Sequence, residues 1–534
     1  MPSSDRLYDV IVIGSGPTAV HAAWPLIEAG LSVAIIDGGN RPDESIEGEF
    51  TEDFFGVRQR SDQFKLFLGS DLSGVAAANS EDYSQAIGFG ARSYIVEDTK
   101  RQLPIKPTST HLIQTLARGG LAEAWGGACA IFNQSELRSV GIPESAMAQH
   151  YQLIIDRIGV SGPDSQFDTQ PPLELDSNAV QIQKRDKGYK QRSDRFTLHQ
   201  PLLAVLSRKK GDREAISYRD LEFWLNDQKS IYRATFTLEE LQRQENCVYW
   251  PSWVATLVKE MSSETVVVAK ALHGQPLERE FRAKRVVLAC GAINSTRLLL
   301  KSFNLYERKV PFLTKKHIVI PCLNIATLGR GDERRRHSLC QLVIEDQLEQ
   351  SGLGGSFTQL YSYRSLLYTK LLNHSPLPTP ETLSLLGLFG PSIVLADVRV
   401  PSFEHAGKYA LLSRSSDNKL VVEQSESISE RSHREETVKA IVRYLKSLGL
   451  LPLRAVEMPF GSTAHYAGGA PRVEHADSKE LLLSTDFEGR LVQSRRIYLA
   501  DGTTWRVLPA KPPTLTMMAD ANRVGTLLAK KLRP

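Results

Sequence analysis

The chain of 534 residues has few cysteines, and none of them forms a paired motif. The five are odd in number, widely spaced and free of any CxxC: Cys129, Cys247, Cys290, Cys322 and Cys340. This pattern disfavours a disulfide framework and a zinc site and indicates reduced thiols. We therefore expect a cytoplasmic protein without a bound metal.

A strong charge imbalance and a long apolar run are also missing. Lys and Arg total 65 against 61 Asp and Glu, a formal charge of +4, which gives no case for nucleic-acid binding. No apolar run approaches the roughly 18 residues of a membrane-spanning helix. The first apolar stretch, residues 10–13, is too short for a signal peptide. What remains is a chain long enough for more than one lobe.

The first motif is a glycine turn between a strand and a helix. Residues 8–13 read as a buried parallel strand, and GSGPTA follows at once. Gly14 permits the tight turn, and Gly16 lets the backbone approach a pyrophosphate. Ala19 allows close packing of helix on strand. Thr18 falls in the first helical turn, where free N–H groups attract phosphate.

An acidic residue follows at the spacing that a nucleotide site requires. A second apolar strand, residues 31–36, ends at Asp37 and Gly38, and Asp37 lies 23 positions after Gly14. A carboxylate there accepts hydrogen bonds from ribose hydroxyls. The motif predicts a dinucleotide site but does not separate FAD from NAD.

A second glycine-rich stretch surrounds a tryptophan. Gly119 and Gly120 precede Trp125, and Gly126 follows it. Glycines beside an aromatic ring suit a backbone that lies against a flat ligand. A plain loop is the alternative.

Three further turns fit the same cofactor. The apolar strand at residues 285–290 contains Ala289 and ends at Gly291. The strand at residues 496–500 ends at Asp501 and Gly502. A long helix then opens at Pro513 and Thr514 and runs to about residue 532. Such turns suit contacts to a ribityl chain and a ring edge.

In this order the blocks resemble the glucose-methanol-choline (GMC) family of flavin oxidoreductases. The resemblance implies an α/β fold with a Rossmann-type FAD-binding lobe, a parallel sheet with helices. An α+β cap that contains an antiparallel sheet would hold the substrate. It assigns FAD contacts to Gly14, Gly16, Thr18, Ala19, Asp37, Gly38, Gly119, Gly120, Trp125, Gly126, Val254, Ala289, Gly291, Asp501, Gly502, Pro513 and Thr514.

The resemblance also assigns a catalytic base. His465 opens an H-x-x-G-G turn, and in the family this histidine takes the hydroxyl proton while the alcohol carbon delivers hydride to the flavin. A neutral imidazole that titrates near pH 6.5 suits that transfer. An ordinary loop histidine is the alternative.

The sequence departs from the family at two positions. Pro512 stands where the family usually places a second Asn or His, and proline offers no side-chain hydrogen bond. Lys511 or Thr514 could substitute, the cap could position the substrate, or the chain could have drifted from alcohol oxidation. Ala124 stands where sugar-oxidising relatives link a histidine to the flavin, so we expect non-covalent FAD.

The FAD-binding lobe is expected to be discontinuous. Residues 1–133, 241–305 and 461–534 would build it, and residues 134–240 and 306–460 would form the cap. For residues 355–396 we expect two short apolar helices, with a helix that touches a membrane surface as the alternative. A basic run at residues 330–336 is expected to form a surface turn.

The functional expectation is an FAD-dependent oxidation of a CH–OH group on a sugar, polyol or other small alcohol. The sequence leaves the electron acceptor open. Two alternatives also stay open: a redox-neutral flavoprotein such as a lyase or isomerase, and a flavin-binding protein without catalysis.

Overall fold

The computed structural model describes most of the chain. The described residues are 6–42, 49–70, 90–106, 108, 110–188, 195–274, 277–328, 337–347, 355–363, 375–415, 418–473 and 481–533. The architecture is mixed α/β, with one mixed sheet and separate antiparallel sheets, which confirms the α/β prediction at this level.

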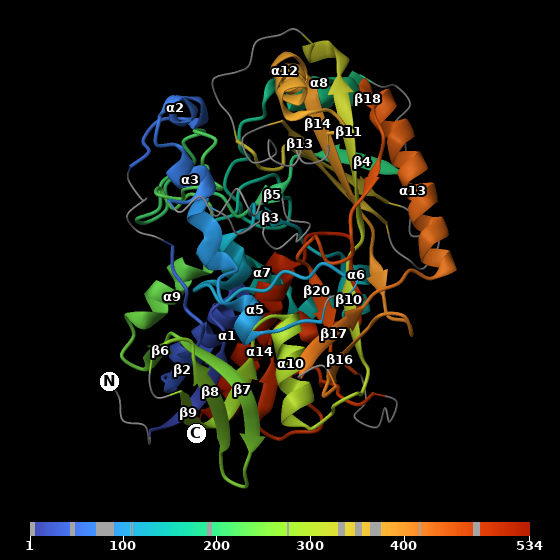
Figure 1. Ribbon diagram of the computed structural model, residues 1–534. Helices are drawn as coiled ribbons and strands as arrows, with labels where there is room; N and C mark the ends of the chain where they lie inside the picture. The colour runs from blue at the N-terminus through green and yellow to red at the C-terminus, as the bar shows by residue number, and fades with distance from the viewer. Residues whose placement is uncertain are drawn as a thin grey trace.

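A seven-stranded mixed sheet forms the lower body of the molecule (Figure 1). Its order is β6-β2-β1-β9-β8-β7, and β21 pairs with the second half of β9. Strands β6, β2, β1, β9 and β21 run parallel, whereas β7 and β8 are antiparallel to their neighbours. The bounds are β1 Leu7–Ile13, β2 Val33–Ile36, β6 Cys247–Trp250, β7 Trp253–Glu260, β8 Thr265–Ala271, β9 Glu278–Leu288 and β21 Ile497–Leu499.

The parallel strands are apolar because both faces of the sheet are covered. Val10 and Val12 pack toward α1 and α14, while Ile11 and Ile13 pack toward α10. An uninterrupted apolar run is the pattern expected of such a strand. The helices are α1 Pro17–Glu28, α10 Ala292–Ser302 and α14 Thr514–Leu532, with α9 Ala234–Gln242 and α7 Ala148–Ile158 beside them.

A second seven-stranded sheet, antiparallel throughout, forms the upper body (Figure 1). Its order is β18-β11-β14-β13-β12-β4, and β19 pairs with the first half of β11 on the same edge as β18. The long helix α13 covers one face (Figure 1). The bounds are β4 Phe196–His199, β11 His317–Asn324, β12 Leu342–Asp346, β13 Phe357–Ser362, β14 Ile393–Arg399, β18 Leu450–Pro452, β19 Val456–Glu457, α8 Ser177–Gly188, α12 Thr379–Phe389 and α13 Ile428–Ser447.

Smaller sheets join the two bodies. A four-stranded sheet has the order β17-β16-β10-β20, and two short pairs are β15 with β22 and β3 with β5. Their bounds are β10 Val310–Thr314, β16 Tyr409–Ser413, β17 Lys419–Glu423, β20 Tyr466–Gly468, β15 Ser402–Phe403, β22 Val507–Leu508, β3 Ala128–Cys129 and β5 Leu202–Leu203.

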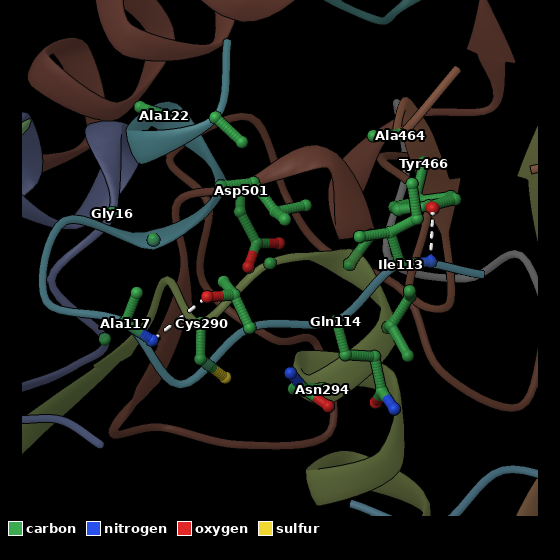
Figure 2. Close-up of a pocket in the computed structure, with 18 of the residues that line it drawn as sticks. Gly16, Ile113, Gln114, Ala117, Ala122, Cys290, Asn294, Ala464, Tyr466 and Asp501 are labelled. Carbon is green, nitrogen blue, oxygen red and sulfur yellow. Dashed lines mark hydrogen bonds between the residues drawn. The ribbon is translucent and has the colours of Figure 1, made fainter. Parts of the chain in front are cut away.

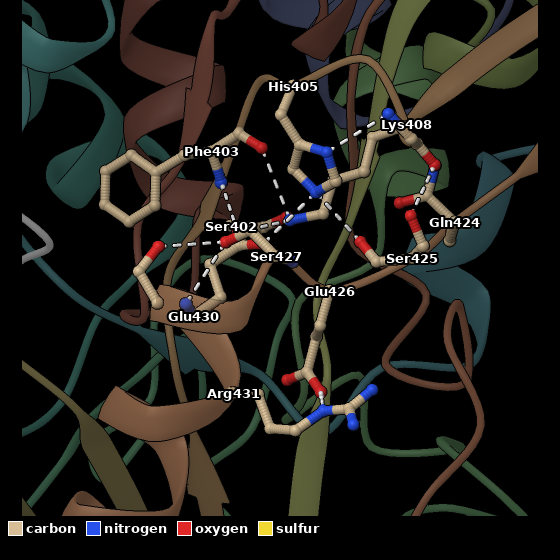
Figure 3. Close-up of polar contacts among 12 residues, drawn as sticks. Ser402, Phe403, His405, Lys408, Gln424, Ser425, Glu426, Ser427, Glu430 and Arg431 are labelled. Carbon is tan, nitrogen blue, oxygen red and sulfur yellow. Dashed lines mark hydrogen bonds and ion pairs between the residues drawn. The ribbon is translucent and has the colours of Figure 1, made fainter.

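A polar network fastens the start of α13 to β15 (Figure 3). Glu430 completes a capping box with Ser427 and also binds the ammonium group of Lys408. Lys408 further donates to the hydroxyl of Ser402 at 2.9 Å and to the carbonyl of Phe403 at 3.3 Å. Both charges are buried, so each depends on the other for compensation.

The expectation of two short apolar helices in residues 355–396 is partly wrong. One helix, α12, is present, but residues 357–362 form β13 and residues 393–399 form β14, with alternate residues of both strands facing a sheet core. Strands β6 and β7 are separate, because Pro251 interrupts the ladder and Ser252 has a φ of +66°. The basic run at 330–336 lies outside the described residues, as do residues 364–374.

In the part of the chain that is described, no helix combines the length and apolarity needed to cross a bilayer.

Candidate functional site

One cavity of about 810 Å³ brings together segments that are far apart in the sequence. Sixteen of the eighteen predicted site residues line it: Gly14, Gly16, Thr18, Asp37, Gly38, Gly120, Trp125, Gly126, Val254, Ala289, Gly291, His465, Asp501, Gly502, Pro513 and Thr514. In Figure 2, Gly16, Cys290 and Asp501 come from three such segments and border the same space.

The other two predicted residues lie behind the cavity wall. Ala19 is fully buried in the core between α1 and the sheet. The N–H of Gly119 donates to the hydroxyl of Ser15 at 2.9 Å, and this bond ties the second glycine stretch to the first turn. Both positions therefore support the wall without forming its surface.

Glycine is required at position 14 by the protein's own structure, whether or not a ligand is bound. Its φ is +106°, and a Cβ there would lie 2.6 Å from the carbonyl oxygen of Ala289 on the neighbouring segment. Gly16 differs, because a Cβ would meet nothing closer than 3.8 Å in the protein. Its small size leaves room on the cavity side.

Three helices begin at the cavity wall without a side-chain cap. These are α1 after Gly16, α10 after Gly291 and α14 after Pro513, and none of the three N-cap residues makes a side-chain cap hydrogen bond. Uncapped helix N-termini carry free donors and a partial positive charge. Their convergence suits a ligand with several acceptor or anionic groups.

Asp37 ends β2 at the cavity and is held by two hydroxyls. Ser15 Oγ donates to its Oδ2 at 2.7 Å, and Tyr249 OH donates to the same atom at 3.0 Å. Burial raises the pKa of Asp37 to about 6, although these hydrogen bonds and those from the backbone of Gly38 and Gly39 oppose the rise. The carboxylate is therefore mostly ionised at pH 7.

His465 stands just before β20 on a strained turn. Ala464 has a left-handed φ of +57°, a conformation that costs of order 1 kcal/mol or more in a residue with a Cβ. The Nδ1 atom of His465 is buried and has no hydrogen-bond partner among the described residues. Burial lowers the pKa of His465 well below its ordinary value, and the positive charges of Lys315 and Arg399 lower it further. The imidazole is therefore neutral at pH 7.

One face of the antiparallel sheet forms the opposite wall. Alternate residues of three strands face the cavity: His317 and Val319 on β11, Gln359 and Tyr361 on β13, and Leu395, Asp397 and Arg399 on β14. The intervening residues of these strands belong to the core beneath α13. This division follows from the two-residue period of a strand.

A chain of hydrogen bonds fixes the polar part of this wall. His317 Nδ1 donates to Asp397 Oδ1 at 2.7 Å, and Arg399 donates to Asp397 Oδ2 through Nε at 3.0 Å and Nη2 at 2.8 Å. The Arg399 and His317 charges hold the pKa of Asp397 well below its usual range, despite burial. His317 Nε2 lies 2.9 Å from the hydroxyl of Ser462, three residues before His465.

The hydroxyl group of Ser462 also has a second hydrogen-bond partner. It donates to the carbonyl of Pro459 at 2.7 Å, and a serine has only one hydroxyl proton. The contacts therefore form a chain from Asp397 through His317 and Ser462 to the carbonyl of Pro459. This chain fixes the orientation of the His317 ring at the cavity wall.

The structure distinguishes the proposed substitutes for the missing group at Pro512. Pro512 and Thr514 line the cavity, whereas the ammonium group of Lys511 lies 3.2 Å from Glu136 and 3.7 Å from Glu345. Lys511 is thus engaged elsewhere. Thr514 and polar residues of the antiparallel sheet line the same cavity as His465.

That sheet wall was not predicted from the sequence. Asp397 and Arg399 sit in an apolar strand at an i, i+2 spacing, which places both on one face, and this was the available signal. Gln359 and His317 gave no local signal, because their proximity depends on strand pairing. Buried Lys315, which donates to the carbonyls of Ala510 at 3.2 Å and Lys511 at 2.6 Å, was missed for the same reason.

No protein-family model matches the chain, and no curated protein matches it.

Proposed function

We propose that the protein is an FAD-dependent oxidoreductase that oxidises a CH–OH group of a sugar, polyol or other alcohol. In this proposal the lower body is a Rossmann-type FAD-binding lobe, the upper antiparallel sheet belongs to the substrate cap, and His465 is the general base. FAD is bound without a covalent link. The observation that carries the proposal is the single cavity lined by both the first glycine turn and His465.

The cavity residues fit FAD at several points. Gly16 leaves room for a pyrophosphate against the uncapped start of α1. Asp37 has the acceptor character that ribose hydroxyls need, and Val254 lies on the wall where the adenine would rest. The starts of α10 and α14 supply donors for the flavin ring and its side chain. Bound FAD would supply the hydride acceptor.

The protein's own residues would accept the hydroxyl proton of the substrate. Neutral His465 takes the hydroxyl proton of the substrate, which makes the adjacent C–H bond a better hydride donor. The hydrogen-bonded group of His317, Asp397 and Arg399 would hold the polar wall of the cavity in place around the substrate. Lys315 holds the loop before α14 through two carbonyls and so fixes the position of Thr514.

An absorption spectrum of the purified protein tests the cofactor directly. We expect flavin bands near those of free FAD, and a yellow supernatant with colourless protein after acid precipitation. A protein that stays colourless after addition of excess FAD would contradict the proposal.

The role of His465 is tested by anaerobic flavin bleaching. Sugars and polyols should bleach the wild-type flavin, whereas His465→Asn should retain FAD and lose bleaching by roughly 100-fold or more. His111→Asn, outside the cavity wall, is the matched control. Turnover of a substrate without bleaching would favour the redox-neutral alternative, and unchanged bleaching in His465→Asn would remove His465 from the mechanism.

A further inference from the structure

Gln359 is a buried amide whose hydrogen-bonding capacity is unused. Only 1% of its surface is exposed, and neither its amide oxygen nor its amide nitrogen has a hydrogen-bond partner among the described residues. The thiol of Cys340 lies beside it, but that thiol donates to the carbonyl of Leu342 at 3.2 Å. A thiol sulfur is only a weak acceptor, so it does not satisfy the amide.

An unsatisfied buried amide carries a cost. Each unpaired donor or acceptor costs about 1 to 3 kcal/mol, and a protein tolerates it where a ligand later makes the bond. Gln359 faces the same cavity as His465, on the wall opposite the glycine turns. The group that completes its hydrogen bonds is therefore expected in this cavity.

The charged neighbours of Gln359 on the sheet wall bond to one another and leave its amide unpaired among the described residues. It pairs across the ladder with Asp397, whose two carboxylate oxygens are taken by His317 and Arg399. The ring of Tyr361 continues the same face one step along β13. The wall thus offers the unpaired amide of Gln359 beside a fixed ion pair and the phenol of Tyr361.

We propose that Gln359 binds a second hydroxyl group of the substrate, distinct from the one that His465 deprotonates, and thereby selects polyhydroxylated substrates over monohydroxylic alcohols and sterols. This inference rests on the proposed function and names the substrate class of that site. A hydroxyl group both donates and accepts, and the primary amide of Gln359 offers both complementary atoms. A sterol would leave both atoms unpaired.

The test compares cyclohexanol with the 1,2-, 1,3- and 1,4-cyclohexanediols as probes. Each diol has one hydroxyl group more than cyclohexanol, and the three diols place that group at different distances from the first. With wild-type protein loaded with FAD, at least one diol should reduce the flavin about 10- to 100-fold more efficiently than cyclohexanol. In Gln359→Leu this ratio should fall toward one, with FAD still bound.

Thr358→Val is the matched control. Thr358 is the preceding residue of β13, is fully buried and also has an unpaired hydroxyl, but it does not line the cavity. The preference for a diol should survive in this variant. If Gln359→Leu does not fold, Gln359→Met, which keeps an unbranched side chain of similar length, takes its place.

Two results would overturn the inference: equal efficiency for all four probes in the wild type, or an undiminished preference in Gln359→Leu. Isothermal titration calorimetry with the same four probes measures their dissociation constants, and this measurement does not require flavin reduction. If no alcohol reduces the flavin, the proposed oxidation fails. The inference then stands only if a diol still binds more tightly than cyclohexanol in the wild type and the preference is lost in Gln359→Leu.

Discussion

At the scale of single residues, burial moves two ionisable groups of the cavity in opposite directions. It lowers the pKa of His465, with help from Lys315 and Arg399, and it raises the pKa of Asp37 to about 6. The imidazole is thereby kept neutral, as a proton acceptor must be. The Asp37 carboxylate is brought close enough to neutrality for pH to change its binding properties.

FAD affinity should therefore depend on pH through Asp37. Ribose hydroxyls donate to the ionised carboxylate, so binding is favoured above the pKa of about 6 and weakens as pH falls through it. Below pH 6 the dissociation constant should rise by up to about tenfold per pH unit and level off near the pKa of the bound form. Fluorescence titration of apoprotein between pH 5 and 8 measures this. Asp37→Asn should bind more weakly with a flatter profile, and an unchanged pH dependence in that variant would contradict the assignment.

Flavin reduction should have a different pH dependence. Because the pKa of His465 is lowered well below its ordinary value, its neutral form persists at pH values where a free histidine becomes protonated. With FAD saturating, the rate constant for reduction by an active alcohol should not halve near pH 6.5. Stopped-flow traces between pH 5 and 8 give this profile, and an acid limb centred at 6.5 would show that the base is a solvated histidine.

The pair of His317 and Asp397 can be separated from a purely structural role by the same profile. His317→Asn should slow flavin reduction about 10- to 1,000-fold, since the hydrogen bonds that connect Asp397 to Ser462 and fix the polar wall of the cavity are lost. FAD affinity should stay within about twofold, because the glycine turns are untouched. If the variant reduces its flavin at the wild-type rate but has a lower Tm, His317 has only a structural role.

At the scale of secondary-structure elements, a series of contacts runs from α13 to the start of α14. Glu430 at the start of α13 holds Lys408, which bonds to β15, and β15 pairs with β22. The loop after β22 is then fixed by Lys315. A contact far from the cavity thus helps to position Pro512 and Thr514.

Lys408→Met should destabilise the protein because it leaves Glu430 buried without its partner. We expect a loss of about 3 kcal/mol in the free energy of unfolding, measured by urea denaturation. Lys259→Met is the control, since Lys259 and its partner Glu280 are both half exposed and the pair should contribute about 1 kcal/mol or less. Equal losses in both variants would argue against a special role for the buried pair.

The elements that the sequence predicted well are those with strong local patterns. The first strand, the helix after Gly16 and the last helix follow from apolar runs bounded by glycine and proline, and all three lie within a few residues of their expected bounds. Of the two helices expected in residues 355–396, one is present as α12, whereas residues 357–362 form strand β13, because a short apolar run fits either structure. The polar face that includes Gln359 and Asp397 depends on strand register, which no local pattern encodes.

At the scale of the whole molecule, the cavity depends on segments from the start, middle and end of the chain. Strands β1, β9 and β21 are neighbours in one sheet, so the turns after them reach the cavity side by side. A ligand that contacts all three turns should stabilise the fold as a unit.

FAD should therefore raise the stability of the apoprotein. At about 100 times the dissociation constant the expected gain is about 2.7 kcal/mol, visible as a shift in Tm. Gly16→Ala should unfold like the wild-type apoprotein, since its new methyl group meets no protein atom within 3.8 Å, but should lose most of the FAD-dependent shift. Gly14→Ala should instead destabilise the apoprotein itself, because its Cβ would lie 2.6 Å from the carbonyl oxygen of Ala289. A full FAD shift in Gly16→Ala would place the ligand elsewhere.

The alternation of β11, β13 and β14 has a consequence for how the site could diverge. Residues such as Gln359 and Tyr361 can be exchanged for others while Leu360, between them, keeps the layer beneath α13 intact. Substitutions on the cavity face of this sheet can thus change substrate specificity while the opposite face, which packs against α13, keeps the fold stable. Descendants of this chain that accept different molecules should differ first at those alternate positions.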